Sequence, residues 1–126
     1  AATVMACNNL ISLLEMSKSM LTRAGVELRN DENPLDLLIQ QTVTNYLNSN
    51  AQAALTGPIA RGDVTTVASH LLALQNTPNE WQDTYRGLGK MAVQISARQG
   101  QASAEQLQEI LRLLNVETDN QTSDNN

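Results

Sequence analysis

Aromatic side chains are almost absent from this sequence. Phenylalanine is missing, and one tryptophan and two tyrosines bring the aromatic share of the 126 residues to 2%. Because strands favour β-branched and aromatic residues, whereas closely packed helices can be built from Leu, Ala and Met, this composition favours an all-α fold. A chain of this length can bury about 65–70% of the surface that its unfolded form exposes, so one domain with its own core is expected.

Cysteines, basic residues and long apolar runs are also scarce. The single cysteine, Cys7, excludes an internal disulfide and fits either a reducing compartment or a simple buried thiol, of which the buried core position is favoured. Acidic residues outnumber basic ones by 13 to 8, which argues against a nucleic-acid partner. No apolar run approaches the roughly 20 residues that span a bilayer, and no signal peptide is recognisable. We therefore expect a soluble, cytoplasmic protein without a membrane partner. A metal site is not expected either, because the lone histidine and the lone cysteine form no ligand cluster.

Apolar residues recur at helical spacing along most of the chain. They predict a single all-α domain of five to six helices over residues 1–116, with a polar, disordered tail over 117–126. The expected helices cover about 3–24, 35–47, 64–75, 78–99 and 104–114, with a short turn or helix tail at 51–55. The expected inward face of helix 64–75 consists of Val64, Val67, Ala68, Leu71, Leu72 and Leu74. That of helix 78–99 consists of Trp81, Tyr85, Leu88, Ala92 and Ile95, with Met91 alongside. That of helix 104–114 consists of Leu107, Ile110, Leu111 and Leu114.

Residues typical of helix ends separate these segments. Gly25 and Gly100 are expected to end helices. N-caps are expected at Asn33, before a proline at the first helical position, and at Asp63. Capping boxes are expected at Thr77, with Glu80 three residues later, and at Ser103.

Chemically distinctive residues concentrate between Leu55 and His70. Gly57 and Pro58 predict the end of one helix, Gly62 permits a tight corner, and Asp63, Thr66 and the only histidine, His70, share one face of the next helix. An imidazole on a polar stripe could transfer protons or recognise an anion. The alternatives remain open, because capping explains Asp63 and a hydrogen-bonded surface position explains His70.

Arg61 carries a planar guanidinium suited to a phosphate or carboxylate. However, Asp63 at the following helix start would repel a second anion, and a structural role for Arg61, bonding loop carbonyls or a partner subunit, explains it as well. No complete catalytic constellation is recognisable, so the catalytic residues stay unassigned.

Several strings together resemble a known family. They are Ala6-Cys7-Asn8-Asn9-Leu10, Leu21-Thr22-Arg23-Ala24-Gly25, Leu55-Thr56-Gly57-Pro58-Ile59-Ala60-Arg61-Gly62-Asp63 and His70-Leu71. The sequence resembles, from Ala1 to about Leu114, the C-terminal helical domain of bacterial two-domain Rossmann-like NAD(P)-binding oxidoreductases. In that group this half is catalogued as a domain of unknown function, and the wider superfamily includes 6-phosphogluconate dehydrogenase and pyrroline-5-carboxylate reductase.

The resemblance implies a 6-phosphogluconate dehydrogenase C-terminal-like helical bundle that dimerises and faces the substrate. It also implies an N-terminal Rossmann domain absent from this chain, which would hold NAD(P), so that no cofactor is bound here. The polar residues expected to line or brace the interdomain cleft are Asn8, Thr56, Arg61, Asp63 and His70. Hydroxyacid dehydrogenases carry a catalytic lysine three residues ahead of a similar Asn pair, but Met5 occupies that position here.

Two other functions are compatible with the sequence. The chain could be a free-standing helical interaction or scaffold protein, in which the corner at Gly57–Asp63 only shapes a dimer interface. It could also be a small helical enzyme with His70 as its base. An upstream Gly-rich strand-turn-helix segment in the same reading frame would separate the first hypothesis from the scaffold.

Overall fold

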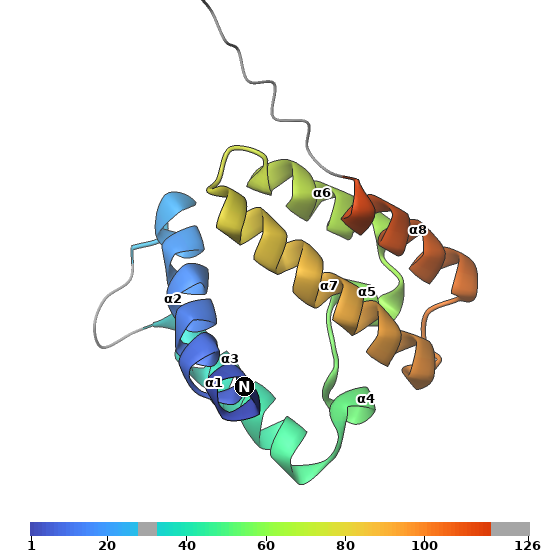
Figure 1. The fold of residues 1–126 in the computed structure, drawn as a ribbon, viewed down its shortest axis with the longest axis horizontal. Coiled ribbons are helices and arrows are strands. Elements are labelled where there is room, and N and C mark those ends of the chain that lie inside the picture. The colour runs from blue at the N-terminus through green and yellow to red at the C-terminus, as the bar shows by residue number, and fades with distance from the viewer. Residues whose placement is uncertain (28–32, 117–126) are drawn as a thin grey trace, which may run out of the picture. The chain divides into compact units, whose positions relative to one another are not determined.

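A computed structural model describes residues 1–27 and 33–116 (Figure 1). Every regular element in these residues is a helix, which confirms the all-α fold class. Five of the helices are eleven or more residues long, in agreement with the five to six expected. The elements are α1 (Ala2–Ala6), α2 (Asn8–Arg23), α3 (Pro34–Asn48), α4 (Ala51–Ala54), α5 (Pro58–Arg61), α6 (Val64–Leu74), α7 (Asn79–Gln99) and α8 (Ala104–Asn115).

The chain divides into two compact units. Unit 1 contains α1 to α3 and ends at Asn48, and unit 2 begins at Ser49 and contains α4 to α8. The tail expected over 117–126 lies outside the described residues.

Unit 1 begins with two helices where one was expected. Cys7 interrupts the helical path between α1 and α2, with φ −117° and ψ −71°. The other end of α2 is as expected: Gly25 adopts a φ of +84°, its amide donates to the Thr22 carbonyl, and the amide of Val26 donates to that of Leu21. This pair of bonds is a Schellman motif, in which glycine supplies the left-handed residue.

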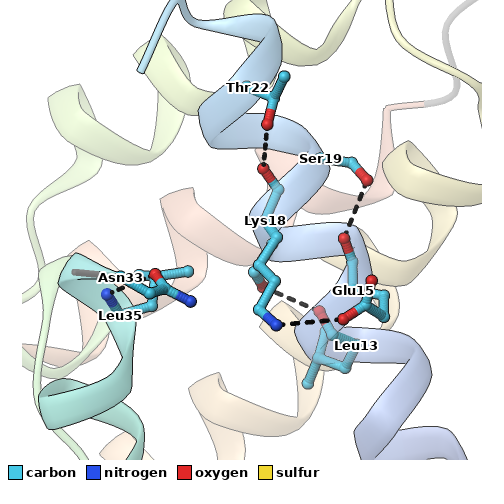
Figure 2. Close-up of polar contacts among 8 residues, drawn as sticks. Leu13, Glu15, Lys18, Ser19, Thr22, Asn33 and Leu35 are labelled. Carbon is cyan, nitrogen blue, oxygen red and sulfur yellow. Dashed lines mark hydrogen bonds and ion pairs between the residues drawn. The ribbon is translucent and has the colours of Figure 1, made fainter. Parts of the chain in front are cut away.

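The start of α3 also follows the expectation. The side-chain oxygen of Asn33 accepts a hydrogen bond from the amide of Leu35 at 3.0 Å, and Pro34 is the first helical residue (Figure 2). Figure 2 also shows hydroxyl groups on α2 donating to carbonyls one turn earlier, from Ser19 to Glu15 and from Thr22 to Lys18. Such local bonds satisfy the polar side chains without linking α2 to another element.

Unit 1 has no buried residue among those described. Apolar side chains on all three of its helices face outward, and the most exposed, Leu37 and Leu47 on α3, retain 72% and 73% of their accessible surface. The other large exposed ones are Val4, Met5, Leu10, Ile11, Val26, Leu38, Val43 and Tyr46. The apolar residues of these helices are therefore at most half-buried among the described residues.

Unit 2 has a well-formed core. Helices α6 and α8 pack against α7 (Figure 1), and Val67, Val93, Leu107, Ile110 and Leu114 supply most of the buried surface between them. These helices meet closely because the buried Gly89 lies in the middle of α7. A Cβ at that position would lie 3.0 Å from the nearest Leu114 methyl carbon.

The expected inward faces of α6, α7 and α8 each need correction. On α7 the buried positions are Gln82, Gly89, Val93 and Ser96, whereas Leu88 and Met91 are exposed, because the core approaches the side of the helix that carries small and polar residues. On α6 and α8, Leu72 is 65% exposed and Leu111 is 37% exposed, while Val67, Leu74, Leu107, Ile110 and Leu114 are buried as expected.

The capping box expected at Thr77 is also wrong. Pro78 occupies the N-cap position of α7, and the hydroxyl of Thr77 donates instead to the carbonyl of Leu74 at 2.7 Å. Thr77 thus satisfies the last turn of α6, behind it in the chain. The box at Ser103 is confirmed, since its side chain accepts from the Gln106 amide and the Gln106 side chain accepts from the Ser103 amide.

Candidate functional site

The corner, defined here as residues 57–63, is a single helical turn between two glycines with positive φ. Gly57, with φ +90°, precedes α5, and Pro58 is the first helical residue, where its missing N–H costs nothing. Gly62, with φ +69°, ends α5, and the amide of Asp63 donates to the carbonyl of Pro58 at 2.8 Å. Gly62 forms the tight corner that was expected. Gly57 and Pro58, however, begin α5, whereas they were expected to end a helix; the preceding helix α4 already ends at Ala54.

Gly62 has a second reason to be glycine. A Cβ at this buried position would lie 2.5 Å from the side-chain oxygen of Gln106, at the start of α8. The corner is therefore held closely against the capping box that begins α8.

Asp63 is the N-cap of α6, as expected. One carboxylate oxygen accepts from the amide of Thr66 at 3.0 Å, and the other accepts from the Thr66 hydroxyl at 2.7 Å. These two bonds are the main reason that the pKa of Asp63 lies below its ordinary value, and the positive charges of Arg61 and His70 lower it further. Asp63 is thus an anion whose acceptor capacity is largely used within its own helix.

The guanidinium of Arg61 is exposed at the end of α5. Among the described residues it forms no hydrogen bond with a loop carbonyl, so the structural bonding considered from the sequence is not found within this chain. Its charge acts on Asp63. Arg61 is therefore free to meet an anionic or polar group from outside the described chain.

His70 lies on α6, exposed, two turns after Asp63. Its Nδ1 is 2.9 Å from the hydroxyl oxygen of Tyr85 on α7, and the two rings meet edge to face with centroids 5.9 Å apart. Tyr85 is partly buried against the core, and burial raises the pKa of its hydroxyl. At neutral pH this pair therefore combines a neutral phenol with an imidazole that can reach solvent.

The remaining two predicted site residues lie elsewhere. Thr56 is exposed and immediately precedes the corner. Asn8 is the first residue of α2, in unit 1, where its carbonyl accepts from the Ser12 hydroxyl at 3.3 Å. The structure thus places Arg61 and Asp63 at the start of α6 and His70 two turns further along that helix, whereas Asn8 belongs to the other unit.

Sequence reasoning missed the polar residues of α7 that hold this region in place. The Ser96 hydroxyl donates to the carbonyl of Ile59 in α5 at 3.1 Å. The side-chain amide of Gln99 donates to the carbonyls of Gln52 and Leu55 at 2.7 and 3.0 Å. The sequence spacing could have revealed them, because Ser96 and Gln99 follow Val93 at helical intervals on one side of α7.

Unit 1 contains a separate groove between α2 and α3. Its volume is about 240 Å³, and it is lined by Ile11, Leu14, Glu15, Lys18, Asp36, Ile39 and Gln40. At its edge Lys18 and Glu15 form an exposed ion pair at 3.3 Å. The groove is thus mainly apolar with a charged rim.

The described residues contain no group of three or more His, Cys, Asp and Glu side chains placed to bind a metal ion. None of their helices is both long enough and apolar enough to cross a membrane.

Comparisons with known proteins give one match. No curated protein and no solved structure matches the chain. The sequence profile of DUF2520, described as a domain of unknown function, matches residues 1–92, which include the corner, His70 and Tyr85. This chain is therefore a member of the DUF2520 family.

Proposed function

We propose that this chain is the C-terminal, dimer-forming and substrate-side helical domain of an NAD(P)-dependent oxidoreductase, and that it is not catalytic alone. In this proposal the protein belongs to the 6-phosphogluconate dehydrogenase C-terminal-like superfamily and acts in the cytoplasm. Membership of DUF2520 and the resemblance of the Leu55–Asp63 string support it. The observation that carries it is the exposure of the apolar side chains of unit 1.

The exposed apolar surface of unit 1 supports a partner. Unit 1 has no buried residue among those described, and it exposes ten large apolar side chains between Val4 and Leu47, all but Val26 on its helices. Proteins that work as monomers rarely expose contiguous apolar patches larger than a few hundred Å², and isolated helices of about 15 residues are only marginally stable in water. A second copy of the chain would cover these faces, and a self-complementary helical surface is suited to two-fold symmetry.

In this proposal the corner and His70 face the substrate. The guanidinium of Arg61, at the end of α5, and the imidazole of His70, on α6, both interact electrostatically with the anionic Asp63. Both groups donate hydrogen bonds, as recognition of a polar substrate requires. Thr56 and Asn8 are proposed as further residues that line or brace the interdomain cleft.

NAD(P) would be held by a Rossmann domain outside this chain. No residue here is assigned to the cofactor, and no metal is required by the proposal. The chain alone is therefore expected to show no NADPH binding in calorimetry, and affinity in the low micromolar range would overturn this division of roles. The product of the complete reading frame should bind NADPH, and an Arg61→Ala variant of it should keep that binding while losing turnover.

The second candidate is a free-standing helical scaffold protein. The same exposed apolar faces favour it, because they fit any helical partner. The coding sequence immediately upstream separates the two: a Gly-rich strand-turn-helix segment in frame supports the oxidoreductase, and a start codon close to Ala1 supports the scaffold.

A further inference from the structure

The pairing of His70 with Tyr85 restricts which nitrogen of the imidazole faces solvent. Tyr85 lies close to Nδ1, at 2.9 Å, so Nε2 is the nitrogen left for other partners. His70 itself is exposed, whereas Tyr85 packs against the buried core of unit 2. The phenol is therefore the fixed member of the pair and the imidazole is the accessible one.

The chemistry of the two groups sets the direction of their hydrogen bond. A phenol is a much better donor than a neutral imidazole N–H, and a neutral imidazole nitrogen is a better acceptor than a phenol oxygen. With Tyr85 neutral, its hydroxyl donates to Nδ1 of neutral His70. The proton of the neutral imidazole then resides on Nε2, so that nitrogen points outward as a donor.

We propose that Tyr85 is a positioning residue that makes His70 a fixed Nε2–H donor for an oxygen acceptor, a carbonyl or carboxylate group of the substrate. The inference rests on the proposed function for its substrate, but its structural part concerns this chain alone. No proton is transferred in this role: the Nε2–H group only binds and orients the acceptor oxygen.

The surroundings of His70 agree with a donor role. Asp63, whose charge interacts with that of His70, accepts two hydrogen bonds from Thr66, and Arg61 offsets the Asp63 charge. Among the described residues the carboxylate of Asp63 forms no hydrogen bond with His70, so Nε2–H keeps its capacity for an external acceptor. Arg61 can supply a second donor to a carboxylate, whereas a neutral carbonyl needs His70 only.

The single histidine makes a direct test possible. In ¹⁵N-labelled protein every imidazole signal comes from His70, so its tautomer can be assigned by NMR without ambiguity. Above the titration range of the imidazole, we expect Nδ1 to be unprotonated and Nε2 to be protonated. An Nδ1–H tautomer in the wild-type chain would overturn the proposal without any variant.

Variants of the two tyrosines test whether Tyr85 determines the tautomer of His70. Tyr85→Phe is expected to give a mixture of both tautomers and to increase the rate at which diethyl pyrocarbonate modifies His70 several-fold, because the blocked nitrogen becomes free. Tyr46→Phe, at the exposed tyrosine of α3, is the matched control and should behave as the wild type. An unchanged tautomer in a Tyr85→Phe chain with normal helical content would overturn the positioning role.

Small molecules that carry a carboxylate or a carbonyl group test which oxygen acceptor the Nε2–H group of His70 binds. We expect acetate or acetamide, titrated to tens of millimolar, to shift the Nε2 signals of the wild-type chain and to shift them less in Tyr85→Phe. A response to acetate alone indicates a carboxylate partner, and a response to both indicates a carbonyl partner. Absence of any response overturns the donor role, whereas failure of the complete protein to bind NADPH would refute only the proposed oxidoreductase.

Discussion

The buried hydroxyl of Ser96 in α7 donates a hydrogen bond to the carbonyl of Ile59 in α5, 3.1 Å away and 37 positions earlier in the sequence. Ser96 has no exposed surface. This bond ties the longest helix of the fold to the segment that precedes Arg61 and Asp63. The position of the corner therefore depends on a residue that lies far from it in the chain.

Ser96→Ala should destabilise the protein by about 1 kcal/mol, the usual net contribution of one buried hydrogen bond. The loss stays moderate because the Ile59 carbonyl also accepts from the Gly62 amide. Urea unfolding followed by circular dichroism measures the change. Ser69→Ala, at an exposed serine of α6, is the control and should change stability by less than about 0.5 kcal/mol. Equal unfolding midpoints for the two variants would contradict the role of Ser96.

Gly62→Ala should cost about 2–3 kcal/mol, because it combines a left-handed backbone with a Cβ 2.5 Å from the Gln106 side chain. A Gln106→Ala background removes the contacts with the side-chain oxygen and its carbon, at 2.5 and 2.7 Å, and keeps only that with the Cβ at 2.9 Å, so the same substitution should cost less. Thermal or urea unfolding of the four proteins gives the coupling between the two sites.

Gly25→Ala is the matched control for this pair. Gly25 has a φ of +84°, but a Cβ there meets nothing within 4 Å, so only the backbone strain of about 1 kcal/mol is expected. If both glycine variants lose the same stability, close packing against Gln106 does not matter.

Asp63→Asn tests the charge at the start of α6. The folded-state pKa of Asp63 lies below the ordinary value of 3.8, so its charge stabilises the folded protein at higher pH. That contribution is lost as the pH falls below about 3.8 and through the folded-state pKa. Asparagine keeps the N-cap acceptor and removes the charge. The wild type should therefore be more stable than Asp63→Asn at pH 7, and the difference should shrink near pH 3.

A difference that stays constant with pH would show that the charge of Asp63 plays no part. Asp63→Ala, which removes both the acceptor and the charge, should be less stable than Asp63→Asn throughout. The other shifted acid, Glu109, is identical in all three proteins, so its titration cancels from the comparison.

Gln99→Glu should destabilise the protein much more than the small change in side-chain size suggests. The Gln99 amide donates to two carbonyls, and an ionised carboxylate at the same place has no hydrogen to donate. We expect a loss of about 3 kcal/mol at pH 7, as for an uncompensated buried charge. Desolvation raises the pKa of the introduced carboxyl, so the gap to wild type should narrow as the pH falls from 7 to 5. Gln108→Glu, at an exposed position of α8, should show neither effect.

Leu47→Glu tests the proposed dimer. Leu47 on α3 is 73% exposed, so the charge should leave the fold of the chain intact and weaken its self-association at least tenfold in sedimentation velocity experiments. Leu72→Glu, at a leucine of α6 that is 65% exposed in the unit with its own core, is the control and should still dimerise. A wild-type chain that remains monomeric at high concentration would contradict the dimer itself.

Local signals in the sequence predicted most of the helix ends. Asn33, Asp63 and Ser103 cap helices, and Gly25 and Gly100 end them, because each effect operates within a few residues. The prediction of a capping box at Thr77 failed for an equally local reason. The Thr77 hydroxyl can form a hydrogen bond with α7 or with α6, and in the structure it donates to the carbonyl of Leu74. Capping patterns alone do not decide between two such neighbours.

The inward face of α7 depended on information from other parts of the chain. Trp81 and Leu88 look like core residues, but α8 approaches over Gly89, and the buried face carries Gln82 and Ser96. The carbonyl that Ser96 binds belongs to Ile59, 37 positions earlier, and one of those that Gln99 binds belongs to Gln52, 47 positions earlier. For the same reason the sequence placed His70 on a polar stripe but could not identify Tyr85, fifteen residues later, as its partner.

The match to the family profile ends at residue 92, inside α7, two turns before Gln99. A protein fragment cut at that residue would retain the corner, His70 and Tyr85, but would lose Ser96, Gln99 and the whole of α8. Every residue of the buried core cluster except Val67 would go with them, namely Val93, Ala102, Leu107, Ile110 and Leu114. Anyone who expresses or transplants this domain should therefore choose its C-terminal boundary from the packing of α8, near residue 116, and not from the extent of sequence similarity.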